Sequence, residues 1–296
     1  MEEILGMAAA VLSSGLGGTS IAATRFLVGG IDPLAIGSFR FGIGMLLLLP
    51  FVLVERGPLP RLRDWPAIAV LGLLFFTLFP VLFNAALAFT TAARGALALS
   101  TLPLISIVIG AALGRETATL RKTAGVMVAM GGVALALISG LQQAPQGAWR
   151  GDLLMVAAAL CMALYGICSK PLIARYGAIP FTGMAMALGA VCLIGIGIGR
   201  GSFAPVAAFG PSQWIATLYL GAIGGAFTFY LWSYALDRTT PTRVAIAVTV
   251  NPISASLVGA VLLDEPLGWP LAAGIGAVFA GIWLANMPGS DRARKP

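Results

Sequence analysis

The chain has 296 residues, of which 59% are hydrophobic and 10% are charged, and its mean hydropathy is +0.96. Soluble domains carry about 25% charged residues, so this composition excludes a water-soluble protein and predicts an all-α integral membrane protein. The net charge of +7 does not indicate nucleic-acid binding, because the basic residues lie between apolar runs and form no single binding face.

The residue types that carry most enzyme chemistry are scarce. The sequence contains no histidine, and its three cysteines all lie inside apolar runs. Histidine is the commonest general base and the commonest zinc ligand. The apolar runs also contain no paired acids and no Ser/Lys dyad. We therefore expect no enzyme activity, no metal and no cofactor.

Apolar runs of about 20 residues, the length that crosses a bilayer core, follow one another along the chain. Short polar or Gly/Pro-containing segments separate them, such as ERGPLPRLRD and QQAPQGAWRGD. The acidic start, MEEIL, does not fit the basic start of a signal peptide, so the first run is assigned to the membrane. The ten predicted spans are 4–24, 33–54, 66–88, 95–113, 122–140, 151–169, 179–199, 213–235, 242–263 and 268–287.

One segment of the sequence has a similar counterpart in the second half of the chain. TTAARGALALSTLPL begins at Thr90, and TTPTRVAIAVTVNPI begins 149 positions later at Thr239. The same shift matches further residues well beyond these two lines. The matched pairs are Trp65 and Trp214, Gly72 and Gly221, Arg94 and Arg243, Pro103 and Pro252, Glu116 and Glu265, Gly125 and Gly274, and Gly132 and Gly281.

The repeat divides the chain into two halves of five spans each. We assign a first five-helix repeat to 1–141, a second to 150–288 and a basic cytoplasmic tail to 289–296. Because five is odd, the halves enter the membrane from opposite sides and are inverted repeats. This architecture favours a transporter, since two equivalent halves can open to either side in turn. The alternative is a duplication that only enlarges the bundle.

The basic residues predict the orientation. Most of them, including Arg61, Arg115 and Lys170, fall on one side of the membrane if both termini lie on that side. The positive-inside rule makes this side the cytoplasm. We expect a multi-pass protein that lies in the lipid bilayer of a bacterial inner (plasma) membrane and acts on a small-molecule substrate. Ten helices can enclose a path alone, so we expect a functional monomer.

Several segments resemble one family. RGALALSTLPLISIVIGAALGRE, at 94–116, resembles the fourth helix of the EamA-type drug/metabolite transporter superfamily, and RVAIAVTVNPISASLVGAVLLDE, at 243–265, resembles the ninth. AGVMVAMGGVAL and AGIGAVFAGIWL fit the fifth and tenth helices. Within this family the chain resembles a bacterial exporter of aromatic and other neutral amino acids. The resemblance implies ten helices, with the first four of each half around a central cavity and the fifth and tenth at the periphery.

Two prolines mark matched positions inside the spans. Pro103 and Pro252 each free a backbone carbonyl and bend a helix. We predict a kink or hinge at each, and a place in the cavity lining is an equal alternative. Ser100, Thr249 and Asn251 supply hydrogen-bonding groups at the same depth and are candidate substrate-binding residues.

Arg40 is a charged residue within the second span, about two turns after Pro33. A cation inside the membrane is costly and usually functional, so Arg40 is a candidate for binding a substrate carboxylate. The alternatives are an ion pair with a carboxylate of the protein, or a side chain that reaches the outer interface.

Aromatic residues gather in the third and eighth spans. In FTFYLWSY, at 227–234, the residues Phe227, Tyr230 and Tyr234 share one helical face. Phe229 and Trp232 are expected to point elsewhere. An aromatic wall with few polar groups suits an apolar amino-acid side chain, and lipid-facing or core positions are the alternative. The candidates are Phe79, Phe83, Asn84, Tyr165, Phe227, Tyr230 and Tyr234.

No Asp or Glu lies in the middle of a predicted span. Proton-driven antiport commonly uses an intramembrane carboxylate, so we expect facilitated export. We predict an exporter of small neutral metabolites, chiefly amino acids including aromatic ones, that works by alternating access. The alternatives are an exporter of other metabolites, organic anions such as sugar phosphates, or drugs, and coupling to protons.

Overall fold

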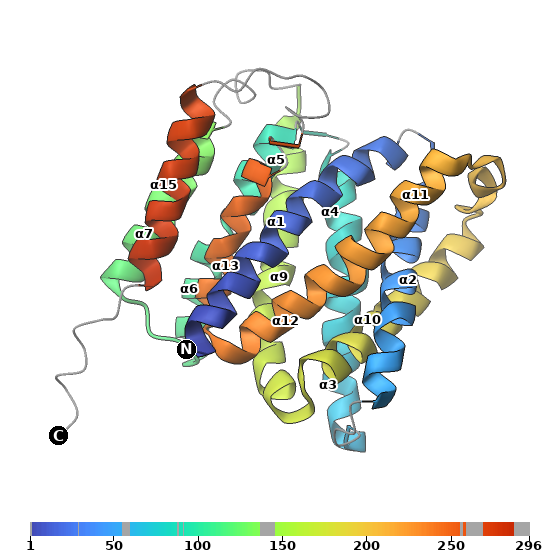
Figure 1. Ribbon diagram of the computed structural model, residues 1–296, viewed down its shortest axis with the longest axis horizontal. Coiled ribbons are helices and arrows are strands. Elements are labelled where there is room, and N and C mark those ends of the chain that lie inside the picture. Colours follow the sequence, from blue (N-terminus) through green and yellow to red (C-terminus); the bar gives the residue numbers. More distant parts are fainter. Residues whose placement is uncertain are drawn as a thin grey trace.

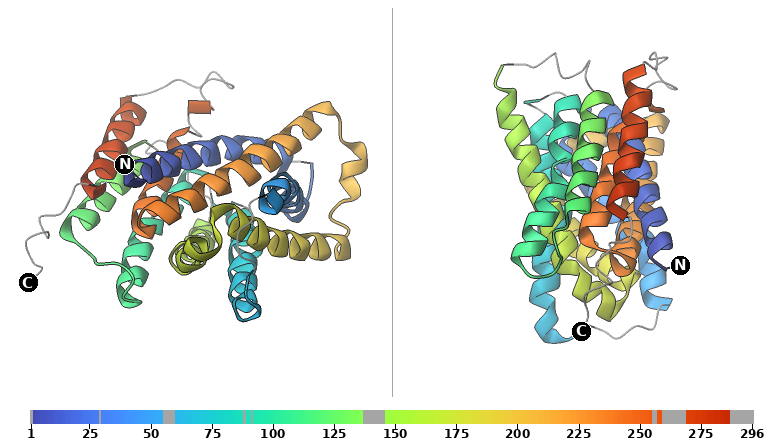
Figure 2. Two further views of the ribbon diagram at one scale, coloured as in Figure 1. Left: turned by 60° about the horizontal axis from the view of Figure 1, so that its bottom comes forward. Right: turned by 90° about the vertical axis from the view of Figure 1, so that its left-hand side faces the viewer.

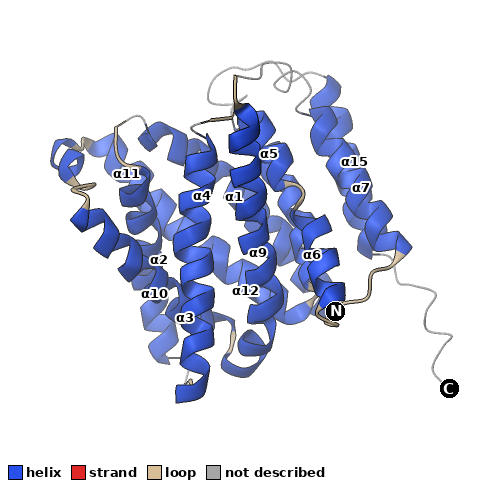
Figure 3. Cartoon of the chain, turned by 180° about the vertical axis from the view of Figure 1, so that it is seen from behind, coloured by secondary structure: helices blue, strands red, loops and turns tan. Residues whose placement is uncertain are grey.

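The computed structural model describes residues 2–28, 30–54, 60–87, 89–90, 92–136, 146–254, 257–258 and 269–286. These residues fold into helices with no strand among them, which confirms the all-α prediction (Figure 1, Figure 3). The helices of the first part are α1 (Glu2–Val28), α2 (Pro33–Val54), α3 (Trp65–Leu73), α4 (Phe79–Leu87), α5 (Ala92–Leu99), α6 (Leu102–Ala112) and α7 (Leu120–Ala136). Those of the second part are α9 (Ala148–Tyr176), α10 (Ala178–Gly199), α11 (Pro211–Tyr219), α12 (Thr228–Arg238), α13 (Pro241–Ala247) and α15 (Trp269–Asn286).

Two longer helical stretches contain a π-helical segment, in which the backbone is wound more loosely. Leu74–Leu78 joins α3 to α4, and Leu220–Phe227 joins α11 to α12. When the sequence is shifted by 149 positions, the first segment falls inside the second. Segments of this kind occur frequently at functional sites. Short 3-10 turns cover Leu62–Asp64, Ala204–Ala208 and Val248–Val250.

The apolar helices are those of a multi-pass membrane protein. Five described stretches are long and apolar enough to cross a bilayer, and two shorter apolar helices cover Leu97–Ala112 and Ala272–Ala285. Helices occupy described parts of all the predicted spans, although the number of crossings stays a prediction. The five long stretches are Pro33–Val54, Leu62–Ala86, Ala148–Tyr176, Ala178–Gly199 and Pro211–Arg238.

Helices α7 and α15 pack side by side at one edge of the bundle (Figure 1, Figure 2). A Cβ atom on Gly132 would lie 2.8 Å from the carbonyl oxygen of Gly274, and one on Gly281 would lie 2.5 Å from that of Gly125. Only glycine permits backbones to approach this closely. The contacts join early residues of each helix to late residues of the other, so the pair is antiparallel. Its place at the edge agrees with the peripheral position that the resemblance implies.

Close backbone contacts also hold α2 and α10 against the two π-helical segments. A Cβ atom on Gly225 would lie 2.4 Å from the carbonyl oxygen of Arg40 in α2. Next to the other π-helical segment, a Cβ atom on Gly189 of α10 would lie 2.4 Å from the Cβ atom of Phe76. These contacts place Arg40 directly beside the loosely wound turn that precedes α12.

Candidate functional site

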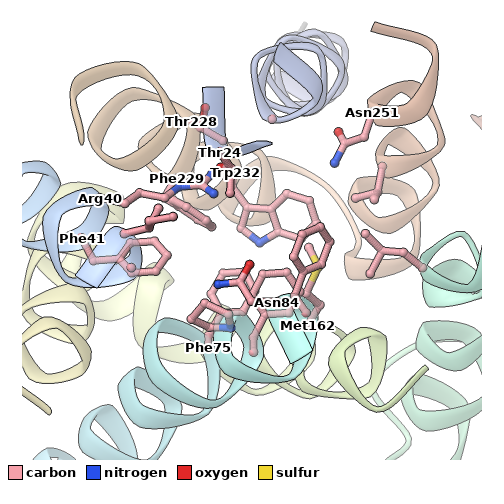
Figure 4. Close-up of a pocket in the computed structure, with 18 of the residues that line it drawn as sticks. Thr24, Arg40, Phe41, Phe75, Asn84, Met162, Thr228, Phe229, Trp232 and Asn251 are labelled. Carbon is pink, nitrogen blue, oxygen red and sulfur yellow. The ribbon is translucent and has the colours of Figure 1, made fainter. Parts of the chain in front are cut away.

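A cavity of about 400 Å³ lies inside the helical bundle (Figure 4). It extends from Ser13 and Ser14, in the middle of α1, to Thr24, Pro33 and Thr90 near the ends of α1, α2 and α4. None of the lining residues identified among the described residues comes from the first eleven residues of α1 or from α2 beyond Phe41. The cavity therefore reaches the end of the bundle opposite the N-terminus.

One side of the cavity is polar. The Ser13 hydroxyl donates to the backbone carbonyl of Thr228 at 2.8 Å, which joins α1 to α12. Further along α1, a Cβ atom on Gly17 would lie 3.3 Å from Oδ1 of Asn251, so the Asn251 amide packs against the α1 backbone. We call Ser14, Arg40, Thr228 and Asn251 the polar arc, because they all line this cavity.

The guanidinium group of Arg40 is held by the π-helical turn. Its Nε and Nη2 atoms donate to the carbonyl oxygen of Gly224 at 3.0 and 2.8 Å. The N–H of Thr228 bonds to the carbonyls of Ile223 and Gly225 instead of Gly224, its usual α-helical partner. The loose turn thus presents the Gly224 carbonyl to Arg40. The guanidinium carbon also lies 5.6 Å from the ring centroid of Phe229, a cation–π distance.

Arg40 keeps hydrogen-bonding capacity toward the cavity that it lines. Within the described ranges, no carboxylate forms an ion pair with Arg40, and its Nη1 atom has no hydrogen-bond partner. The alternative of an ion pair with a carboxylate of the protein is therefore not found in this part of the chain. Guanidinium groups bind carboxylates through paired N–H donors, so Arg40 is suited to an anionic group of a ligand.

The cavity is also lined by an aromatic wall, which we define as Phe75, Phe79, Phe83, Phe229 and Trp232. The Phe75 and Phe79 ring centroids are 5.4 Å apart, and those of Phe79 and Phe83 are 5.8 Å apart. Met162 of α9 and Asn84 of α4 also line the cavity (Figure 4). Such a surface accommodates an apolar or aromatic group.

Four buried polar atoms of the lining have no hydrogen-bond partner among the described residues. They are Ser14 Oγ, Thr228 Oγ1, Trp232 Nε1 and Asn251 Oδ1. Buried polar groups in proteins are nearly always paired. A cavity lined by four such groups is therefore suited to a polar ligand.

The structure brings five of the residues predicted from the sequence to this cavity, namely Arg40, Phe79, Phe83, Asn84 and Asn251. Ser100 and Thr249 are buried in helix breaks and lie outside the lining. Tyr165 is also outside it, because its ring stacks behind Phe75 at a centroid distance of 4.2 Å.

The structure turns a different face of α12 toward the cavity from the one expected from the sequence. Phe227 exposes 42% of its surface, and Tyr230 and Tyr234 lie outside the lining, whereas Phe229 and Trp232 line the cavity. The π-helical segment directly before α12 adds backbone to the preceding turn and rotates the following face. Regular α-helical spacing does not reveal this rotation.

Both predicted kink prolines follow a break in the helix. Helix α5 ends at Leu99, and α6 begins at Leu102 with Pro103 in its first turn. In the second half, the 3-10 turn Val248–Val250 precedes Pro252. Leu99 and Val248, and not the prolines, line the cavity. A role of the prolines as hinges stays a prediction.

The repeat contained the signal for the residues that were missed. Shifting Phe79, Pro80 and Phe83 by 149 positions gives Thr228, Phe229 and Trp232, and all six line the cavity. Leu99 and Val248 form a fourth matched pair in the lining. Applying the shift to the aromatic candidates of the third span would have selected the correct face of α12.

A charged network holds the other end of the bundle together. The Glu116 carboxylate forms an ion pair with Lys122 at 3.1 Å and accepts the Thr242 N–H at 2.9 Å. Lys170 of α9 donates to the carbonyl of Thr239 in the turn before α13. Ion pairs link the start of α1 to the same region, between Glu2 and Arg238 and between Glu3 and Arg243. This network, the α12–α13 network, joins four parts of the chain where the cavity does not reach.

Comparisons with known proteins match the sequence of this chain to membrane transporters. The model of the EamA-like transporter family matches residues 4–138 and again 149–287, which confirms the family resemblance found in the sequence. An uncharacterized transporter of Archaeoglobus fulgidus is 29% identical over 258 residues, covering 86% of this chain and 88% of that protein.

Two further comparisons concern a named exporter and a solved structure. A Streptantibioticus cattleyicolor protein named "Probable terminal-alkyne amino-acid exporter" is 32% identical over 251 residues, with 82% of this chain and 81% of that protein covered. One crystal structure aligns with a TM-score of 0.79 over 97% of this chain and 98% of that chain, at 20% identity. At that identity the likeness concerns the fold alone.

Proposed function

The chain belongs to the EamA-like transporter family, and from this premise we propose that it exports neutral amino acids with apolar side chains, including aromatic ones. The family is one of membrane transporters, and the helices are those of a multi-pass membrane protein. The amino-acid substrate is supported by the two-sided cavity and by the name of the Streptantibioticus relative.

The observation that carries the proposal is that Arg40, which forms no ion pair among the described residues, lines the same cavity as an aromatic wall. Arg40 supplies positive charge to the polar arc, and no Asp or Glu is among the lining residues that the structure describes. In Figure 4, Phe75 of the wall lies on the side of the cavity opposite Thr228 and Asn251 of the arc. An amino acid matches both sides, since its carboxylate fits Arg40 and its side chain fits the wall. A volume of about 400 Å³ falls within the usual range of small-molecule sites.

The proposed mechanism is alternating access between two inverted halves. The matched cavity pairs, such as Phe83 and Trp232, and the antiparallel contact of α7 with α15 support it. The cavity reaches one end of the bundle while the α12–α13 network holds the other end. We propose that both termini are cytoplasmic in a bacterial inner membrane, that a monomer suffices, and that export is facilitative.

Export of organic anions is a second candidate, because Arg40 gives the described lining a net positive charge. Such a substrate would need a carboxylate and no ammonium group. The two candidate substrate classes differ in the ammonium group. Transport assays with matched ligands that carry or lack this group distinguish between them.

Counterflow in liposomes tests the proposal. Purified protein is reconstituted in vesicles loaded with one unlabelled neutral amino acid, and entry of the same labelled compound is followed. We expect labelled phenylalanine and leucine to accumulate transiently without an imposed pH gradient. Protein-free vesicles and vesicles loaded with glucose serve as controls. If the protein exchanges none of the common neutral amino acids, the proposed substrate class is wrong. If exchange strictly requires a pH gradient, the proposal of facilitative export is wrong.

A further inference from the structure

Resting on the proposed function, we infer that the cavity requires two opposite charges on its ligand, a carboxylate and an ammonium group, and that Asn251 accepts the ammonium group. The inference starts from the atoms of the lining that lack a partner among the described residues. Their chemistry differs from one atom to the next, and this difference specifies the ligand.

Two of the available groups can only donate hydrogen bonds. The Nη1 atom of Arg40 and the indole Nε1 of Trp232 carry N–H groups and no acceptor. Trp232 is only 5% exposed, so its N–H is removed from bulk water. A carboxylate satisfies both donors, whereas a plain amine satisfies neither and places its positive charge near Arg40.

Asn251 Oδ1 has the opposite requirement. A carbonyl oxygen only accepts hydrogen bonds. The whole Asn251 amide packs against Gly17 of α1, and its Oδ1 atom is buried without a donor among the described residues. The hydroxyls of Ser14 and Thr228 can donate or accept, so they suit either group. Within this set of four atoms, Asn251 Oδ1 is therefore the one that specifically requires a donor from the ligand.

The positions of these groups fit a ligand with two separate polar ends. Arg40 comes from α2, and Asn251 comes from the segment after the 3-10 turn Val248–Val250. In Figure 4 the two side chains lie on different sides of the Trp232 indole. A zwitterion placed along the polar arc directs its carboxylate toward Arg40 and Trp232 and its ammonium toward Asn251. Its apolar side chain then extends toward the aromatic wall.

Ligands that lack one charge leave part of this set unpaired. A deaminated acid leaves Asn251 Oδ1 without a donor, and a decarboxylated amine leaves Arg40 and Trp232 without an acceptor. A missing hydrogen bond to a charged group lowers affinity by about tenfold or more. The site thereby distinguishes amino acids from the organic anions that the positive charge of Arg40 alone would admit.

The test compares three ligands that share one side chain: phenylalanine, 3-phenylpropionate without the amine, and phenethylamine without the carboxylate. Each competes with labelled phenylalanine in the counterflow assay. For the unmodified protein, we expect the concentration of phenylalanine that halves the uptake of label to be at least about tenfold lower than that of either analogue. In the Asn251→Leu variant, we expect the affinity for phenylalanine to fall to that for 3-phenylpropionate. We expect the affinity for 3-phenylpropionate to stay the same.

A second variant shows whether the effect of Asn251→Leu comes from the lost acceptor or from a folding defect. Asn251→Asp keeps the size of the side chain and adds an anionic acceptor, so we expect it to bind phenylalanine and to reject 3-phenylpropionate more strongly. If the unmodified protein exchanges phenylalanine and Asn251→Leu keeps the full preference for it over 3-phenylpropionate, the inference is wrong while the proposed function stands. If the unmodified protein exchanges no amino acid, the proposed function fails, and this inference fails with it.

Discussion

Replacing Arg40 with leucine is expected to lower amino-acid exchange by about 100-fold, since a charge-assisted hydrogen bond contributes up to about 3 kcal/mol. The variant removes the cation that the proposed carboxylate binds. It also leaves the carbonyl of Gly224 without the two donors that approach it at 3.0 and 2.8 Å. The measurement is the initial rate of phenylalanine counterflow, normalised to the amount of reconstituted protein.

Arg40→Lys is the matched variant. Lysine keeps the positive charge but cannot place two nitrogens in the fixed geometry of a guanidinium group, so we expect an intermediate loss of roughly tenfold. Size-exclusion profiles in detergent control for folding. Wild-type exchange by a folded Arg40→Leu protein would show that Arg40 serves only to satisfy the π-helical turn.

Replacing Glu116 with alanine is expected to lower the free energy of unfolding by about 3 kcal/mol. The carboxylate is 5% exposed, and its loss leaves the Lys122 ammonium and the Thr242 N–H unpaired in a mostly buried place. We also expect slower exchange, because the end of the bundle held by the α12–α13 network becomes less ordered. The measurements are the thermal unfolding midpoint in detergent and the counterflow rate.

Two variants show whether the effect comes from the buried contacts of Glu116. Glu116→Gln keeps an acceptor for Thr242 and loses the ion pair, so its midpoint should lie between those of wild type and Glu116→Ala. Asp237→Ala removes an ion pair with Arg238 at 3.2 Å in which both side chains are more exposed. Exposed pairs contribute little, so this variant should stay close to wild type. Equal losses for Glu116→Ala and Asp237→Ala would contradict the role given to the network.

Hydropathy predicted the bounds of one helix closely and missed those of another. The span predicted at 33–54 coincides with α2 (Pro33–Val54). The span predicted at 151–169 is too short, since α9 runs from Ala148 to Tyr176 with Pro171 inside it. Its polar end is stabilised by contacts that composition does not reveal. Tyr176 donates to the Asp64 carboxylate, and Lys170 donates to the Thr239 carbonyl.

The candidate site was predictable where one residue type was decisive. Arg40 was identified from its charge within an apolar run, and the cavity places it among the lining residues. The lining face of α12 was not identified, because it depends on the π-helical segment Leu220–Phe227 and on the Gly224 carbonyl that this segment presents. Small residues such as Gly224 and Gly225 permit these contacts, and no hydrophobic period marks them.

The central claim is that this cavity opens to one side of the membrane at a time and holds the transported molecule. The most direct measurement uses Asn84→Cys, a partly exposed lining position in α4, in a protein whose Cys161, Cys168 and Cys192 are replaced by alanine. An impermeant maleimide is added to one side of sealed, oriented vesicles. We predict modification from the side opposite the N-terminus and protection by phenylalanine at saturating concentration. Equal modification from both sides, or modification that a transported amino acid leaves unchanged, would contradict the account.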